Sequence, residues 1–167
     1  MGAAEYHDCP GCGLRLVADP SAIPSPYHAS AECWRLYGEL VAYTVTRGRD
    51  AFIHQHVVDA YGAQHVGPRS RPIGVAFALL GLYYACERGY SGRQVQHMHM
   101  LLARRSKTWP PFSPPPNVGP LTVADALAAE PGAARDTAVR AWARAVWDAW
   151  GAEHERVRAL ADTVMGD

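Results

Sequence analysis

The chain has 167 residues, of which 49% are hydrophobic and 19% are charged, so it can fold around a buried core. Sixteen basic residues balance sixteen acidic residues. This balance argues against nucleic-acid binding, which usually requires a basic surplus. We expect one domain covering residues 1–167, with no nucleic-acid partner.

The sequence shows no sign of export or of a membrane span. Its first six residues lack the charged and then apolar pattern of a signal peptide. The longest apolar run, residues 73–86, is too short to cross a bilayer comfortably. We therefore expect a cytoplasmic protein with reduced cysteines and no membrane partner. In that compartment a Cys-x-x-Cys sequence predicts a metal or redox site rather than a disulfide.

Residues 7–33 predict a small metal-binding knuckle rather than a helix or a strand. Cys9 and Cys12 flank a Pro-Gly pair, and such a tight turn can wrap two thiols around one ion. A loop rich in proline then leads to Cys33, in the first turn of a helix that Ser30 is expected to cap. The positive end of that helix favours the thiolate form of the cysteine. Three such thiolates predict a zinc site.

The predicted zinc needs a fourth ligand, and the sequence offers several. We favour His65, because it ends a predicted helix just before the break at Gly67-Pro68. His28 is nearer to the cysteines along the chain but lies in a loop. Another histidine, an aspartate or a water molecule are further alternatives. Four protein ligands would make the zinc structural, whereas a water ligand would allow catalysis.

The rest of the chain predicts helices from the spacing of its apolar residues. Residues 34–107 hold most of helices one to four, and residues 108–121 form a proline-rich loop. Residues 122–165 hold the C-terminal helices: a capping box at Thr122 and Asp125 opens a short one, and a last helix is expected over about 134–164. The predicted fold is all-α, a bundle of about five helices with a small N-terminal zinc knuckle.

The second of these helices carries an unusual number of polar residues over positions 54–65. A second metal site could form if ligands from facing helices converged there. The alternative is a core helix whose histidines are satisfied by hydrogen bonds. The residues considered for the second site are His54, Asp59, Tyr61 and His65, joined by His99 and His154.

Three motifs occur together in this sequence: Cys9-Pro10-Gly11-Cys12-Gly13, Ser30-Ala31-Glu32-Cys33-Trp34 and Val58-Asp59-Ala60-Tyr61-Gly62-Ala63-Gln64-His65. With the later segments 119–125 and 142–154, they resemble a family of uncharacterised, largely actinobacterial proteins over nearly the whole chain. The resemblance names no substrate. It implies that one set of residues acts together: Cys9, Cys12, Cys33, Asp59, Tyr61, Gln64 and His65.

Two classes of function agree with these observations. The first, which we favour, is a zinc-dependent enzyme acting on a small molecule, with Asp59, Tyr61 and Gln64 as catalytic residues. The second is a non-catalytic binding or regulatory module with a closed structural zinc. A water-occupied metal position beside Asp59 would favour the enzyme. A complete shell of three cysteines and one histidine, with no adjoining cavity, would favour the module.

Overall fold

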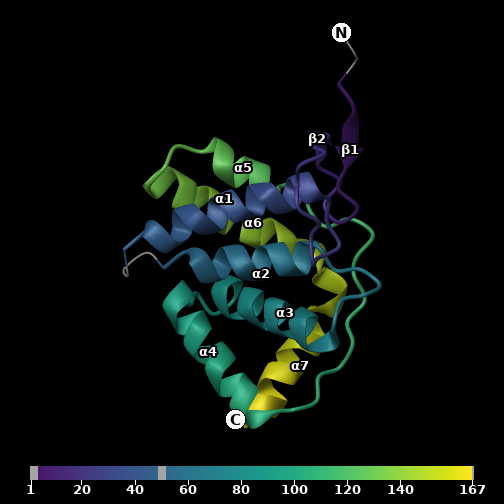
Figure 1. Cartoon of the computed structure of the whole chain (residues 1–167). Coiled ribbons are helices and arrows are strands. Elements are labelled where there is room, and N and C mark those ends of the chain that lie inside the picture. The colour runs from purple at the N-terminus through teal and green to yellow at the C-terminus, as the bar shows by residue number, and fades with distance from the viewer. Residues whose placement is uncertain (1–3, 49–51, 167) are drawn as a thin grey trace.

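The computed structural model describes residues 4–48 and 52–166. These residues form seven α-helices, one 3₁₀ turn and a two-stranded sheet (Figure 1). In chain order they are β1 (Tyr6–Asp8), β2 (Arg15–Val17), α1 (Ala31–Thr46), α2 (His54–Gln64), α3 (Pro72–Cys86), α4 (Gly92–Arg105), α5 (Val123–Ala128), α6 (Ala133–Ala149), the 3₁₀ turn Gly151–Glu153 and α7 (His154–Met165). The predicted helical character is confirmed, but the described residues form seven helices rather than about five and add a small sheet.

Helices α2 and α3 lie at the centre of the bundle. Helix α2 contacts α1, α3, α4 and α6, and α3 contacts α4, α6 and α7 as well. Figure 1 shows α1 and α5 on one side of this pair, and α4 and α7 on the other. Helix α3 is apolar almost all round and buries residues on every side, as expected for a central helix. The polar residues of α2 are therefore enclosed by neighbouring helices.

Local capping interactions determine where several helices begin. Ser30 accepts a hydrogen bond from the Cys33 amide at 3.1 Å, which confirms the predicted cap of α1. Thr122 and Asp125 form the predicted capping box of α5, and Ser91 forms a second one with Gln94 at the start of α4. These caps rest on residues no more than three positions apart, so the sequence alone reveals them.

The prediction that residues 7–33 contain no strand is wrong, because the knuckle includes a β-hairpin. Strands β1 and β2 pair antiparallel, with His7 opposite Leu16. The turn between them is closed by a hydrogen bond from the Cys9 amide to the Leu14 carbonyl. Gly13 has a φ of +75°, which a residue with a side chain rarely adopts. Strands of three residues are too short to show a clear alternation of polar and apolar residues.

The expectation of one long last helix over residues 134–164 is wrong, because the helix breaks after Ala149. A 3₁₀ turn at Gly151–Glu153 separates α6 from α7. The imidazole of His154 donates from Nε2 to the Trp147 carbonyl at 2.8 Å and so satisfies one of the carbonyls that the break frees. The break lets α7 turn and pack against α3 and α4. Trp147 and Trp150 are both buried.

Candidate metal centre

Four side chains from three separate segments meet at one end of the bundle. Cys9 and Cys12 come from the turn of the hairpin, Cys33 from the first turn of α1, and His65 from the end of α2. Their ligand atoms all lie within 4.8 Å of one another. Cys9, Cys33 and His65 are buried, and Cys12 is half-buried. The structure thus brings together the four residues that the sequence analysis selected for zinc.

Two distances inside this Cys3His cluster match a tetrahedral metal site. The Sγ atoms of Cys12 and Cys33 are 3.8 Å apart, and Cys33 Sγ lies 3.5 Å from His65 Nε2. Zinc binds sulfur at about 2.3 Å and nitrogen at about 2.0 Å, so a tetrahedron separates two sulfurs by roughly 3.8 Å and a sulfur and a nitrogen by roughly 3.5 Å. The cluster could therefore hold a metal ion.

The protonation of the cluster also favours a cation. Hydrogen bonds from the thiols of Cys12 and Cys33 lower the pKa of Cys9, whereas the thiols of Cys12 and Cys9 raise the pKa of Cys33. Three thiols at this spacing cannot all ionise by themselves, because neighbouring thiolates repel one another in a buried site. A bound divalent cation removes this obstacle and lets all three become ligands.

The ring of His65 is held in the orientation that a ligand needs. Its Nδ1 atom lies 2.8 Å from the backbone carbonyl oxygen of Tyr61, so this nitrogen carries the hydrogen and donates it. The lone pair then belongs to Nε2, the nitrogen that faces Cys33. The ring also stacks on Tyr61, with 3.9 Å between the ring centroids. The Nε2 atom of the ring is thus presented to the cysteines.

Gly11 allows the hairpin turn to approach α2 closely. A Cβ atom at this position would lie 2.4 Å from the His28 carbonyl oxygen and 2.5 Å from His65 Cδ2. His28 itself is not part of the cluster. Its amide donates to the His65 carbonyl at 3.2 Å, and its ring packs against the backbone at Gly67. His28 therefore braces the loop that carries the fourth candidate ligand.

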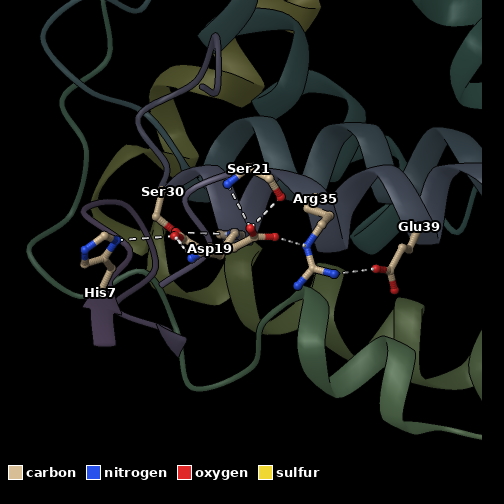
Figure 2. Close-up of polar contacts among 8 residues, drawn as sticks. His7, Asp19, Ser21, Ser30, Arg35 and Glu39 are labelled. Atoms are coloured by element: carbon tan, nitrogen blue, oxygen red, sulfur yellow. Dashed lines mark hydrogen bonds and ion pairs between the residues drawn. The ribbon is translucent and has the colours of Figure 1, made fainter. Parts of the chain in front are cut away.

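Polar contacts attach the hairpin to α1 beside the cluster. Glu32, which precedes Cys33, is 3% exposed and accepts a hydrogen bond from the Asp19 amide at 3.0 Å. Its carboxylate also lies 3.3 Å from His7 Nδ1. Figure 2 shows the neighbouring contacts, in which Arg35 lies between the carboxylates of Asp19 and Glu39. These contacts hold the segment with two candidate ligands against the helix with the third.

The residues predicted to be catalytic do not share one pocket. Tyr61 is fully buried, and its hydroxyl donates to Cys33 Sγ at 3.6 Å. Burial raises the pKa of Tyr61 far above its ordinary value, so this hydroxyl stays protonated. The side chain therefore supports the sulfur of Cys33 and stacks on His65.

Gln64 connects three parts of the fold. Its amide nitrogen donates to the carbonyls of Val118 and Leu121 at 3.1 and 2.7 Å, and its oxygen accepts from Trp142 Nε1 at 2.9 Å. The side chain is 1% exposed. Gln64 thus fastens the segment before α5 to α2 and α6, and these hydrogen bonds use both ends of its amide.

Asp59 lies on another side of α2 and borders a cavity of about 420 Å³. Its Oδ1 atom accepts a hydrogen bond from Gln55 at 3.1 Å, and the same Gln55 amide lies 3.3 Å from His99 Nδ1. His99 Nε2 donates to the Phe77 carbonyl at 3.1 Å. In the described residues Asp59 Oδ2 has no hydrogen-bond partner. Gln55 lies one helical turn before Asp59 in the sequence, and this spacing places the two side chains together.

The second metal site considered from the sequence is not assembled. His54 contacts the Thr44 hydroxyl at 3.0 Å, and His154 contacts the Trp147 carbonyl at 2.8 Å. His99 belongs to the Asp59 network instead. Each of these histidines contacts a different partner in a different place. This agrees with the alternative reading of the sequence, in which the histidines are satisfied by hydrogen bonds.

In the part of the chain that the structure describes, no helix is both long enough and apolar enough to span a membrane. Residues 7–151 match a family described as "Family of unknown function (DUF5946)". A comparison with curated proteins and a comparison with solved structures each found no match. The matched range includes all four residues of the Cys3His cluster. The chain therefore belongs to the DUF5946 family.

Proposed function

We propose that the protein binds one zinc ion through Cys9, Cys12, Cys33 and His65, and that this zinc is structural. The observation that carries the proposal is that three sulfurs and one imidazole nitrogen lie within 4.8 Å of one another, with the Cys12–Cys33 and Cys33–His65 separations at tetrahedral values. Thiolate and imidazole ligands together suit zinc. Four protein ligands complete its usual coordination and leave no position for water or substrate.

The position of the ligands explains what a structural zinc would do here. The ligands come from the hairpin, from α1 and from the end of α2, so one ion would join three segments. The hairpin itself has two strands of three residues and mostly exposed side chains. So small a unit buries too little apolar surface to order itself, and metal binding commonly supplies the missing free energy. The zinc would thus hold the hairpin on the bundle.

Elemental analysis of the purified protein tests this proposal. We expect about one zinc per wild-type chain and loss of the metal, with a lower melting temperature, in Cys12→Ser. Cys86→Ser is the matched control, because Cys86 is a free cysteine outside the cluster. The proposal fails if Cys12→Ser retains full zinc occupancy, or if Cys86→Ser loses the metal as readily.

A second candidate function is acid–base chemistry on a small molecule at Asp59. The supporting observation is a carboxyl group that is 3% exposed, borders a cavity and has one oxygen without a hydrogen-bond partner in the described residues. Burial raises the pKa of Asp59 well above its ordinary value, against the opposing hydrogen bond from Gln55. A raised pKa favours the protonated form of Asp59, which could donate its proton to a ligand.

In this second candidate function, the acid–base chemistry would take place at Asp59 and not at the zinc. Burial lowers the pKa of His99 to about 4, so this neighbour is neutral at pH 7 and leaves the carboxyl without a fixed counter-charge. Titration of the Asp59 carboxyl carbon by ¹³C NMR tests the idea, with the exposed Asp148 as the internal reference. A midpoint for Asp59 close to that of an ordinary aspartate, about 4, would remove the case for a proton donor.

A further inference from the structure

We propose that a second cavity binds the phosphate or carboxylate group of a small organic anion. The cavity has a volume of about 480 Å³ and lies between the start of α2, the end of α3, the start of α4 and one face of α6. The zinc ligands and Asp59 do not line it. The lining residues that carry the argument are His56, Cys86, Ser91, Gly92, Arg140 and Arg144.

The charge of the lining favours an anion. Arg140 and Arg144 lie one turn apart on α6 and both border the cavity, and none of the lining residues that the structure describes is acidic. Arg144 donates one hydrogen bond to the Cys86 carbonyl, which steadies its guanidinium and leaves further N–H groups available. The carboxylate of Glu87 is already bound by Arg158 and Trp147. Two guanidinium groups one turn apart suit a planar or tetrahedral oxyanion.

The start of α4 adds backbone donors to the same wall. Gly92 is the first residue of this 14-residue helix, so its amide lies ahead of the first intrahelical hydrogen bond and points away from the helix. A Cβ atom at Gly92 would lie 1.8 Å from the Phe52 carbonyl oxygen, so only glycine allows α4 to begin this close to the segment before α2. Ser91 caps the helix and borders the cavity too. The amide and the positive helix end both favour an oxyanion.

His56 provides an independent sign that a ligand is missing from this wall. It borders the cavity, is only 6% exposed, and its Nδ1 atom has no hydrogen-bond partner among the described residues. Buried polar atoms are nearly always paired, so an unpaired one at a cavity points to a bound group. Burial and the nearby charge of Arg140 lower the pKa of His56 to about 4, and the neutral ring can donate one hydrogen bond to an oxyanion.

The cavity is larger than a lone oxyanion requires. Its volume lies within the range of small-molecule sites. Ala85, Tyr90 and Ala143 give the lining an apolar part, which suits the organic body of the ligand. Burial raises the pKa of Cys86 to about 11, so its thiol stays neutral and does not repel an anion.

NMR titration of the full, zinc-loaded chain tests the site. Inorganic phosphate and acetate are the two probes, each compared with chloride at equal ionic strength. We expect saturable shifts of the Gly92 amide with at least one probe, and the tighter probe identifies the head group. Saturation with neither probe beyond the chloride control would overturn the proposal.

Variants then assign the binding to the arginines. Arg140→Gln and Arg144→Gln change exposed side chains, so we expect the fold to be retained. Each should weaken binding of the better probe by about tenfold, because a charge-assisted hydrogen bond is lost. Arg104→Gln, an exposed position outside the cavity lining, is the control and should bind like the wild type. Equal weakening in all three variants would mean general charge attraction and would also overturn the site.

Discussion

His65 and Tyr61 are joined twice at the end of α2. The His65 amide donates to the Tyr61 carbonyl at 3.1 Å, and the His65 imidazole donates from Nδ1 to the same oxygen at 2.8 Å. The last turn of the helix therefore fixes both the backbone and the ring of this residue. Because Nδ1 is used in this way, Nε2 is the nitrogen left to bind a metal. Such hydrogen bonds behind a ligand typically orient it and raise its basicity.

The first prediction concerns the fourth ligand. His65→Ala should weaken zinc binding strongly, whereas His28→Ala should leave it nearly unchanged, since His28 is outside the cluster. His65→Cys should bind zinc again, because four thiolates also form a structural site. Zinc affinity is measured by competition with a chelator. Loss of zinc from His28→Ala alone would contradict this assignment.

The second prediction concerns the approach of the hairpin turn to α2. Gly11→Ala should weaken zinc binding, because its methyl group would overlap the His28 carbonyl and the His65 ring. Gly38→Ala is the control: this helical glycine has open space around it, so alanine should be neutral or stabilising by up to about 1 kcal/mol. Zinc content and melting temperature are measured for both. Equal zinc affinity in Gly11→Ala and wild type would mean that the turn can move away freely.

The third prediction concerns Trp150, where α6 ends. It is 1% exposed, and its Nε1 donates to the Ala63 carbonyl of α2 at 3.1 Å. Trp150→Ala should lower the free energy of unfolding by about 3–5 kcal/mol, as for other large buried aromatic residues. Val45→Ala, at a position that is 64% exposed, should change it by less than about 0.5 kcal/mol. Chemical denaturation of both variants measures the difference, and a loss below about 1 kcal/mol for Trp150→Ala would contradict its place in the core.

The fourth prediction concerns acid stability. Burial lowers the pKa of His99 to about 4 in the folded chain. As the pH falls below about 6.5, the unfolded chain binds a proton at this histidine that the folded chain does not, so folding stability decreases with acidity. The loss should extend down to about pH 4 and reach the order of 3 kcal/mol for this residue.

His99→Gln tests this effect. Acid also removes zinc from the cysteines, but that loss is common to both proteins and cancels in the comparison. Denaturation of wild type and variant between pH 4 and 7 should show a shallower pH dependence in the variant. Parallel curves for the two proteins would mean that His99 does not titrate as described.

Features that depend on neighbouring residues could be predicted from the sequence. The caps at Ser30 and Thr122 are hydrogen bonds across two or three residues. The Cys-x-x-Cys turn brings Cys9 and Cys12 together for the same local reason. The end of α2 at His65 could also be anticipated from Gly67-Pro68, whereas its contact with Cys33, 32 residues earlier, depends on how the segments pack.

Features that depend on distant packing were decided only by the tertiary structure. Gln64 accepts a hydrogen bond from Trp142, which lies 78 residues later in the chain, and so helps to hold the fold together. Asp59 and Tyr61 are two residues apart on one helix, so their side chains point to different sides, and only the neighbouring helices determine what each side meets. The cavity between Arg140 and His56 forms because α6 and α2 pack together. Hydrogen bonds across a few residues depend on local backbone geometry. The contacts of Gln64, Asp59, Tyr61 and the cavity depend instead on how the helices pack around a common core.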